Sequence, residues 1–363
     1  MNLLVFNLAT DADDPLLSFA SQWLNRLAAF YERIDVITMR AGRRITPENV
    51  YVHSVGKEKG YGELRRALEF YRLLSGLRRE RPYAACFAHM MPLFAVMGAP
   101  LLIDVPITLW YAHRQAHLIL RVATAVSRRT VSAVEASFPL KTPKLRVIGH
   151  GIDTDFFAPE LALTQAVEGD STGDGGQNLR RTKTIVQVAR LMPIKHQATL
   201  IRALADVPDA QAVFVGDVPP DVDPAYRREL EALARELGVA DRVTFTGNLP
   251  PEGVRVWDRR AAIAVNLSPL GLFDKAALEG MAVGVPTMVS SAAFDDVVED
   301  ARLKISDPED AMALSGRLND LLALREEDCC RMGAALRERV IAAHSLDHLI
   351  GRLVSVLNTG EPE

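Results

Sequence analysis

Apolar residues in the first half of the chain follow two different periods. Short apolar runs are typical of buried strands, and longer stretches with an apolar residue every three or four positions indicate amphipathic helices. The runs at 3–8, 34–38, 50–53 and 84–88 predict strands, and the stretches at 15–30 and 64–77 predict helices. Strands that alternate with helices predict a parallel sheet covered by helices on both faces.

The alternation begins again after a polar segment at about residue 160. Residues 160–183 are rich in Gly, Asp, Asn and basic side chains. Such a segment buries little apolar surface, so we expect a linker or mobile loop. Beyond it, strands are predicted at 184–189, 212–215, 242–246, 261–267 and 285–289, and helices at 196–205, 225–237 and 274–283, with a mainly helical remainder.

Two repeats of this pattern predict two domains in a chain of 363 residues. We expect an α/β protein in which two Rossmann-like, doubly wound domains face a central cleft. The predicted parts are a first domain at 1–158, a polar linker at 159–183, a second domain at 184–340, and a C-terminal helix at 341–363 that crosses back to the first domain. Ligands of such sheets bind at the carboxyl ends of the strands.

One apolar stretch, residues 93–112, has the length of a membrane span. Pro100 and Pro106 interrupt it and Asp104 lies inside it, which favours buried loops and short strands. The N-terminal residues have no basic region and no small-residue cleavage site, so they predict a first strand and no signal peptide. We therefore expect a cytoplasmic protein.

Cysteine usage and charge add to this picture. The three cysteines, of which Cys329 and Cys330 are adjacent, indicate a reducing compartment. Residues 1–158 hold 20 basic and 14 acidic side chains, whereas the remainder holds 22 and 32. The basic clusters are Arg40-Arg43-Arg44, Arg65-Arg66, Arg78-Arg79-Arg81 and Arg128-Arg129. Either this asymmetry is chance variation, or the first half contacts an anionic membrane surface peripherally.

Two cations stand where the second domain begins. A predicted strand ends at Ala189, Arg190 follows it, and Lys195 lies at the start of the next helix. The Arg fork, the Lys ammonium and a helix N-terminus together suit a diphosphate. The alternative is an Arg190 paired with an acid and a solvated Lys195.

A second candidate element follows the strand at 261–267. Asp274 is a plausible N-cap, and Glu279 lies in the early turns of the helix that it opens. A carboxylate there can accept both hydroxyls of a ribose, and the amides of residues 271–273 can bind phosphate. The alternatives are an Asp274 that only caps and a Glu279 that is an exposed helical acid.

At this point the sequence resembles the retaining GT-B glycosyltransferases of bacterial polysaccharide and glycolipid synthesis (group 1, family 4-like). That family has the motifs V-G-R-L-x-x-x-K, V-G-[DE]-G, V-x-F-x-G, E-A-M-A-x-G-x-P and P-x-G-[IV]-D-x-x-x-F. Each motif is matched wholly or in part, in the order given. The first three are matched by Val188–Leu191 with Lys195, by Val215–Asp217 and by residues 243–247. The fourth is matched by Glu279–Ala282 with Gly284 and Pro286, and the fifth by Gly151–Asp153 with Phe157. Five motifs in family order are a specific signal.

The resemblance assigns the donor nucleotide to the second domain and the acceptor to the first. It implies that Arg190 and Lys195 neutralise the diphosphate, that Glu279 holds the ribose, and that His113 contacts the donor sugar. The other donor-binding candidates are Gly216, Asp217, Asn248, Leu249, Gly271, Leu272, Phe273, Asp274 and Lys275. The acceptor-side candidates are Asp13, Asp14, His89 and His150.

The sequence departs from the family at one position. The E-x7-E motif places its first Glu eight residues before Glu279, where this chain has Gly271. That carboxylate normally contacts the donor sugar, and G-x-x-D-K-x-x-L-E replaces the motif here. Asp274 and Lys275 are the candidates to take over its role.

The resemblance implies a retaining glycosyltransferase that moves a hexose from a UDP or GDP donor to a saccharide or lipid-linked acceptor in cell-envelope or exopolysaccharide synthesis. It needs no metal or cofactor, because the cations and helix amides stabilise the leaving diphosphate. We expect no nucleic-acid partner. The membrane contact would lie at the inner face.

Three other interpretations remain. A metal-dependent transferase needs an Asp-x-Asp pair, and Asp11–Asp13 and Asp153–Asp155 fit only the letters. A nicotinamide enzyme lacks its G-x-G-x-x-G signature after the first strand. A catalytically degenerate protein that acts as a binding or scaffold partner is the non-enzyme alternative, and Gly271 motivates it.

Overall fold

The computed structural model describes residues 1–13, 19–113, 115–160, 183–219, 225–269, 271 and 273–362. The chain divides into two compact units. The first comprises residues Met1–Gly151 and Leu346–Glu363, and the second comprises Ile152–Ser345. The C-terminal helix of the chain therefore belongs to the first unit.

A parallel sheet of seven strands forms the centre of the first unit, in the order β3-β2-β1-β4-β5-β6-β7. The strands are β1 (Asn2–Thr10), β2 (Arg33–Ala41), β3 (Val50–Ser54), β4 (Ala85–His89), β5 (Ile107–Trp110), β6 (Arg129–Ser132) and β7 (Leu145–Val147). The order reverses between β1 and β4, which makes this pair the topological switch point of the sheet.

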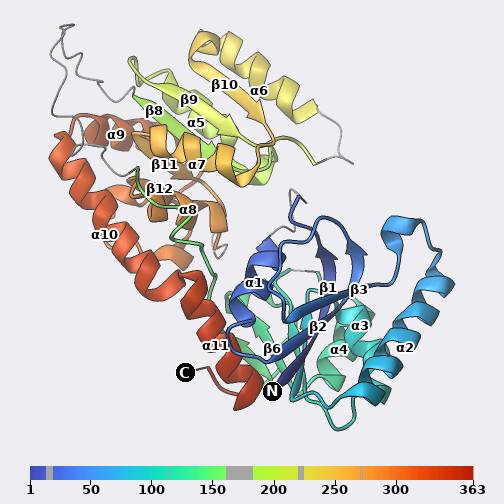
Figure 1. Ribbon diagram of the computed structural model, residues 1–363. Helices are drawn as coiled ribbons and strands as arrows, with labels where there is room; N and C mark the ends of the chain where they lie inside the picture. The colour runs from blue at the N-terminus through green and yellow to red at the C-terminus, as the bar shows by residue number, and fades with distance from the viewer. Residues whose placement is uncertain are drawn as a thin grey trace, which may run out of the picture. The chain divides into compact units, whose positions relative to one another are not determined.

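Helices cover both faces of this sheet (Figure 1). They are α1 (Phe19–Leu27), α2 (Glu63–Glu80), α3 (Pro92–Gly98), α4 (Leu118–Val126) and α11 (Leu346–Asn358). Alternate residues of β1 point to opposite faces. Leu3 and Val5 pack with the core of α1 and α11, whereas Leu4 and Phe6 pack with that of α2, α3 and α4.

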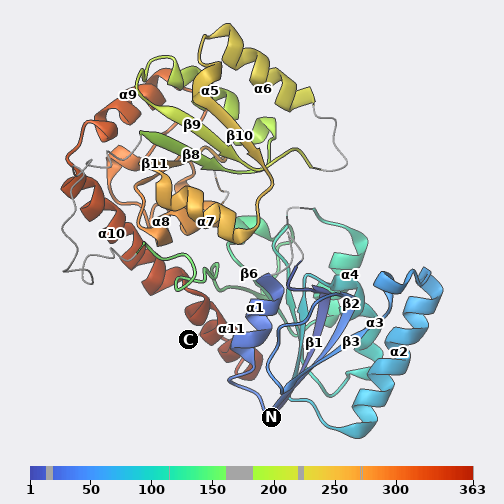
Figure 2. The same ribbon diagram turned by 45° about the horizontal axis from the view of Figure 1, so that its top comes forward.

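The second unit has a parallel sheet of five strands in the order β10-β9-β8-β11-β12. They are β8 (Thr184–Val188), β9 (Gln211–Val215), β10 (Val243–Gly247), β11 (Ile263–Asn266) and β12 (Thr287–Val289). The helices α5 (Gln197–Leu204), α6 (Ala225–Glu236) and α9 (Ala311–Leu322) form one layer, and α7 (Pro251–Arg260), α8 (Lys275–Val283) and α10 (Glu326–His344) form the other (Figure 2).

The predicted α/β class with two doubly wound sheets is confirmed. The structure assigns residues 152–160 to the second unit. Arg337 holds part of this segment, because its guanidinium donates to the carbonyl oxygens of Thr154, Phe157 and Ala282. Most of the predicted polar linker, residues 161–182, lies outside the described residues.

The apolar stretch at 93–112 divides into α3, a short 3-10 turn (Ala99–Leu101) and strand β5. Pro100 and Pro106 interrupt it as the sequence predicts. Among the residues that the structure describes, no helix combines the length and the apolar character needed to cross a membrane.

Candidate functional site

The donor-side candidates cluster around the switch point of the second sheet. Strands β8 and β11 are neighbours there, with Ile185 paired with Ile263, although β9 and β10 lie between them in sequence. Ligands of open α/β sheets bind beside the carboxyl ends of such a strand pair. The segments that follow β8 and β11 carry Lys195 and Ser268, whose side chains meet.

Lys195 is the last residue of a 3-10 turn, Pro193–Lys195, and α5 begins two residues later. Its backbone is fixed because its carbonyl oxygen accepts a hydrogen bond of 2.7 Å from the buried Gln187 side chain. Its Nζ donates to Ser268 Oγ at 2.9 Å and lies 2.5 Å from Asp274 Oδ2. The predicted position of Lys195 between β8 and α5 is therefore observed, and the ammonium is paired rather than solvated.

Asp274 Oδ2 accepts three hydrogen bonds. Lys195 Nζ and Ser268 Oγ donate two of them, and Asn266 Nδ2 donates the third at 3.2 Å. Burial opposes ionisation of this carboxyl, but Lys195 and the hydroxyl and amide donors outweigh it, so the Asp274 pKa lies below its ordinary value. Asp274 carries its negative charge at neutral pH and neutralises Lys195.

The same residue occupies the N-cap position of α8 without capping it. The Asp274 side chain makes no hydrogen bond to the first backbone N–H groups of the helix. These amides and the helix dipole give the start of α8 a partial positive charge, which favours anions. The cap predicted for Asp274 is therefore present in position only, because its carboxylate is bound to Lys195.

Glu279 lies on α8, one turn beyond its start, and is only 9% exposed. Lys275 Nζ lies 2.9 Å from its Oε1. An exposed helical acid, the alternative from the sequence, does not describe this side chain. A buried carboxylate with one cation as its partner retains acceptor capacity for ligand hydroxyl groups.

Asp258 is a buried carboxyl close to Glu279. It lies on α7, its side chain is 1% exposed, and neither of its oxygens has a hydrogen-bond partner among the described residues. Burial, reinforced by the negative charge of Glu279, raises the Asp258 pKa well above its ordinary value. Asp258 therefore holds its proton more tightly than an exposed carboxyl group does.

Other donor-side candidates lie where β9 and β10 end. Gly216 has φ +136°, and a Cβ there would lie 2.2 Å from the carbonyl oxygen of Ala189. The next residue, Asp217, donates its backbone N–H to Asn248 Oδ1 at 3.1 Å, and Leu249 follows Asn248 in a loop. The tight approach of β9 to the end of β8 explains why glycine stands at 216.

Arg190 lies two residues after the end of β8 and is exposed. Its carbonyl oxygen accepts a hydrogen bond from Gln197 Nε2 at 2.9 Å, which holds the loop to α5. No carboxylate of a described residue lies within ion-pair distance of its guanidinium, in contrast to Lys195. Arg190 therefore has donor capacity available for an anion.

The remaining candidates of this unit have different roles. Gly271 (φ +78°) donates its N–H to Ser291 Oγ at 3.1 Å. Phe273 is buried against Phe294 and His344, with ring centroids 4.6 and 5.0 Å away, so it packs in the core. Leu272 lies outside the described residues.

The acceptor-side candidates belong to the first unit. His89 ends β4, next to the switch point, and is buried with its Nδ1 3.4 Å from Asn7 Oδ1. Burial lowers the His89 pKa to about 4. His113 is exposed in the loop after β5, where its Nδ1 accepts from the Gln115 N–H at 3.2 Å.

Asp13, His150 and Asp14 complete this set. Asp13 is exposed and forms an ion pair with Arg43 Nη2 at 2.5 Å, which lowers the Asp13 pKa. His150 is half-buried in the segment after β7. Asp14 lies outside the described residues.

The sequence prediction missed Ser268 and Asn266. Both are buried, and both donate to the carboxylate of Asp274. Their signal was present, because polar residues at the end of an otherwise apolar strand mark the carboxyl edge of a parallel sheet. The sequence gave no comparable signal for Asp258, because its helix contains several other charged residues and an acid there is not unusual.

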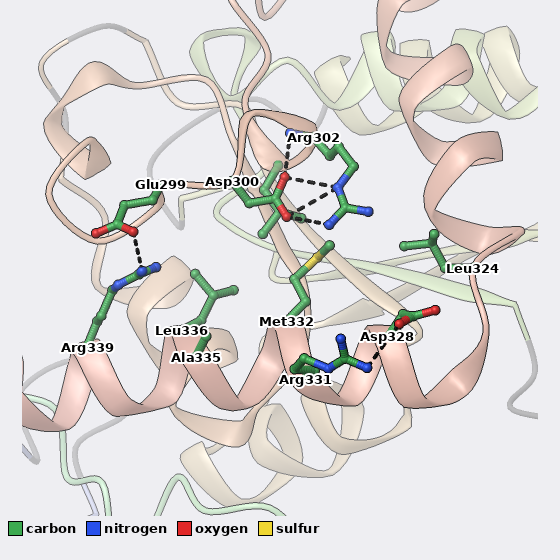
Figure 3. A pocket seen from close by; sticks show the side chains of 11 residues that line it. Glu299, Asp300, Arg302, Leu324, Asp328, Arg331, Met332, Ala335, Leu336 and Arg339 are labelled. Atoms are coloured by element: carbon green, nitrogen blue, oxygen red, sulfur yellow. Dashed lines mark hydrogen bonds and ion pairs between the residues drawn. The ribbon is translucent and has the colours of Figure 1, made fainter.

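A separate pocket of 620 Å³ lies between α10 and the segment at 299–303 (Figure 3). Its three guanidinium groups are paired with carboxylates, at Arg302–Asp300, Arg331–Asp328 and Arg339–Glu299. None of the predicted site residues lines it. The pocket is charge-compensated and is not part of the candidate site.

Residues 176–339 match the model of the family described as glycosyl transferases group 1. A GDP-mannose-dependent alpha-(1-6)-phosphatidylinositol monomannoside mannosyltransferase of Mycolicibacterium smegmatis is 31% identical over 219 residues, which cover 56% of this chain and 53% of that protein. The protein of that description from Mycobacterium tuberculosis is 29% identical over 252 residues, which cover 65% and 61%. The matches thus span little more than half the length of these relatives.

Solved structures are similar over nearly the whole chain. HepE of Anabaena, in complex with UDP and glucose, superposes with a TM-score of 0.72 at 17% identity, and 99% of this chain and 100% of that chain are covered. Sucrose-phosphate synthase of Thermosynechococcus elongatus superposes with a TM-score of 0.69 at 21% identity, with 97% and 98% covered. The chain therefore has the GT-B fold, and its residues 176–339 are similar to the glycosyl transferases group 1 family.

Proposed function

We propose that this protein is a retaining, metal-independent glycosyltransferase that uses a nucleotide-diphosphate sugar. The observation that carries the proposal is the cluster at the β8–β11 switch point. There the Lys195 ammonium lies beside Asp274 at the N-cap of α8, and the buried Glu279 lies on that helix. A cation, the positive N-terminal end of a helix and a carboxylate on that helix match the phosphates and the ribose of one nucleotide.

In this proposal, Arg190 and Lys195 bind the diphosphate and Glu279 accepts the ribose hydroxyls. Negative charge develops on the diphosphate as the glycosidic bond breaks, and cations fixed in advance stabilise it without reorganisation. Gln187 and Gln197 hold the loop that carries both cations. No metal is required in this scheme. Transfer that persists in EDTA supports it, and loss of transfer that Mg²⁺ restores would refute it.

The proposed acceptor is a saccharide or lipid-linked group that enters on the first unit. His113 and His89 follow or end neighbouring strands, β5 and β4, of its sheet. We propose that the departing phosphate assists attack on the same face of the sugar, which retains the anomeric configuration. NMR of the product anomer tests this step, and an inverted product would contradict it.

The nucleotide is the part of the proposal that is tested first. The mannosyltransferase relatives are described as GDP-mannose-dependent, and HepE was solved with UDP and glucose. GDP-mannose and UDP-glucose are therefore the first two donors to assay, and cell-envelope or exopolysaccharide synthesis is the proposed setting. Calorimetry with GDP and UDP should give binding to one of them that Glu279→Gln weakens about tenfold, since a hydrogen bond to a charged group is lost.

A second candidate is a catalytically degenerate binding or scaffold protein. Gly271 favours it, because no side chain stands at 271 where the family has a carboxylate for the donor sugar. The two candidates predict different results with a donor. Nucleotide binding together with sugar transfer supports the enzyme, whereas the absence of both supports the scaffold.

A further inference from the structure

Helix α4 of the first unit exposes an apolar surface to solvent. Leu118 is 75% exposed, and the exposed fractions of Ile119, Val122 and Val126 are 43%, 39% and 41%. Their spacing places the four on one face of the helix. The opposite face, with Leu120 and Ala123, packs into the core of the unit. The exposed face is therefore not a consequence of poor packing, since the helix already has a complete buried side.

Basic side chains surround this face. Arg121 lies on α4 itself, Arg128 follows its end, and Lys141 and Lys144 line a pocket of 530 Å³ together with Arg121. Residues 118–146 contain six basic residues and one acidic residue, Glu135. We call the apolar face of α4 with Arg121, Arg128, Lys141 and Lys144 the α4 surface.

The charges of the α4 surface are not neutralised within the described part of the chain. Lys144 Nζ donates to the carbonyl oxygens of Thr124, Ala125 and Ser127 at 2.7–3.0 Å, which fixes it at the C-terminal end of α4 without a carboxylate. Arg121, Arg128 and Lys141 are exposed, and no described carboxylate pairs with them. The neighbouring Arg129 and Arg146, in contrast, lie within 3.9 and 2.6 Å of Glu361.

A comparison with α2 shows that this combination is specific. Leu64 and Leu68 of α2 are also largely exposed, at 84% and 72%. However, Glu63 and Glu69 lie on the same helix, and both pair with arginines. Helix α4 contains no acidic residue. On α4, unlike on α2, no carboxylate of the same helix offsets the cations beside the apolar face.

We propose that the α4 surface docks the protein onto an anionic phospholipid bilayer. Apolar side chains on one helical face enter the interface between headgroups and acyl chains, and the surrounding cations bind lipid phosphates. At this pocket Arg121 and Lys141 are the donors for one headgroup phosphate, because the three N–H groups of Lys144 already bind carbonyl oxygens. This docking deepens the proposed function, because a lipid-linked acceptor would be presented in the same membrane, but it requires no donor and no transfer.

The placement of α4 fits such an acceptor. The helix begins five residues after His113 and is N-capped by His117, whose Nδ1 accepts from the Leu120 N–H at 3.1 Å. Its N-terminal end, with Leu118 and Ile119, thus comes at the end of the segment that leaves the carboxyl end of β5. A bilayer bound to this face lies next to the edge of the sheet that carries the acceptor-side candidate His113.

Vesicle flotation of the full-length protein tests the proposal. We expect binding to vesicles of phosphatidylcholine with phosphatidylglycerol, little binding to phosphatidylcholine alone, and release by salt. The Arg121→Gln/Arg128→Gln/Lys141→Gln variant should bind at least 20-fold more weakly, because each cation near an anionic surface contributes about a fivefold gain. Leu118→Ser/Val122→Ser should bind about tenfold more weakly.

Two matched variants serve as controls. Lys57→Gln/Lys59→Gln/Arg79→Gln removes three exposed cations elsewhere on the unit, and Leu64→Ser/Leu68→Ser removes two exposed leucines of α2. Both should bind within about twofold of the unmodified protein if the α4 surface alone docks. Equal losses in control and test variants, or no binding of the unmodified protein to either vesicle, would overturn the proposal.

A second copy of the chain is the other possible occupant of this face. Sedimentation without lipid separates it from a bilayer. A dimer that Leu118→Ser/Val122→Ser dissociates would overturn the membrane proposal in favour of self-association. Flotation needs no nucleotide sugar, so the two proposals can fail separately. A protein that floats but transfers no sugar supports the membrane docking and contradicts the transferase proposal. A protein that transfers sugar but does not float supports the transferase and contradicts the docking.

Discussion

Lys195 Nζ lies 2.5 Å from Asp274 Oδ2 at the switch point of the second sheet. The cation that the proposed function assigns to the donor diphosphate is thus already paired with a carboxylate. Asp274 also stands at the N-cap of α8, where a phosphate would otherwise meet the helix amides. A bound diphosphate must therefore compete with Asp274 for one cation, in the presence of the Asp274 charge.

We predict that Asp274→Asn tightens the binding of the nucleoside diphosphate about tenfold. The variant removes one negative charge beside the proposed diphosphate site, where repulsion across a few ångströms is worth on the order of a kcal/mol or more. Asn keeps the size of the side chain and a hydrogen-bonding oxygen for Ser268. Calorimetry with GDP and UDP measures the change.

Lys195→Ala and Asp320→Asn are the controls for this prediction. Lys195→Ala should weaken binding by about tenfold or more, because a charge-assisted hydrogen bond is lost. Asp320→Asn removes an exposed carboxylate of α9 and should have no effect. Weaker binding by Asp274→Asn would show that Asp274 orients Lys195 for the ligand instead of competing with it.

Most of the architecture was predictable from the sequence because most buried strands are short apolar runs, whereas β6 and β7 lack such a run and were not predicted. Strand β5 was not assigned from the pattern, since it lies in an apolar stretch with α3, and periodicity does not separate a buried strand from a buried helix there. Strand β12 begins at Thr287, two residues after the predicted start at 285, because Pro286 has no N–H for the ladder, and it ends at Val289 as predicted.

The sequence predicted where the candidate site residues lie in the fold, but not which side chains they contact. Strand ends and helix starts placed Lys195, Asp274 and Glu279 near one edge of the sheet. Their partners depend on tertiary contacts between segments 73 and 79 residues apart, which no local pattern encodes. Phe273 illustrates the limit, since an aromatic residue beside a predicted site residue gives no indication that it faces Phe294 in the core.

We predict that Gly216→Ala lowers the free energy of unfolding by about 2–4 kcal/mol. Position 216 has φ +136°, and the new Cβ would approach the Ala189 carbonyl oxygen to 2.2 Å, which forces the backbone to move. Gly238→Ala is the matched control, because its φ is +68° and nothing lies within 4 Å of the Cβ position. It should cost only about 1 kcal/mol.

Urea unfolding of the two variants shows whether the cost at position 216 comes from the positive φ or from the contact of the new Cβ with the Ala189 carbonyl oxygen. Equal losses at 216 and 238 would mean that the positive φ alone sets the cost. The loop after β8 also carries Arg190, so Gly216→Ala should weaken nucleotide binding as well, while Gly238→Ala should leave it unchanged.

The buried His89 should make the stability of the first unit pH-dependent. Burial lowers the His89 pKa from its ordinary 6.5 to about 4. Between these values the unfolded chain binds a proton that the folded protein excludes, so stability falls as the pH drops from about 6.5 to about 4. The full effect is about 3 kcal/mol.

The measurement is the difference in unfolding free energy between the unmodified protein and His89→Gln at pH 7 and pH 4.5. Trp23 and Trp110 report unfolding of this region by fluorescence, since both rings lie within 6.4 Å of the His89 ring. From pH 7 to pH 4.5, the unfolding free energy of the unmodified protein should fall more than that of His89→Gln. His113→Gln, which alters an exposed side chain, should show no such shift, and a parallel course for both variants would contradict the role of burial.

The buried acid Asp258 should reduce stability at neutral pH. Its pKa in the folded protein is raised well above the ordinary 3.8, so this carboxyl opposes folding at pH 7, where the unfolded chain holds it ionised and solvated. Asp258→Asn removes this opposition and should raise the free energy of unfolding by about 2 kcal/mol at pH 7. Below pH 3.8 the Asp is protonated in both states, so the gain should disappear.

Urea unfolding at pH 7 and pH 3.5 checks both halves of the prediction, with the exposed Asp241→Asn as the control. A variant that is destabilised at both values would show that the carboxyl makes a specific interaction beside Glu279 that the amide cannot replace.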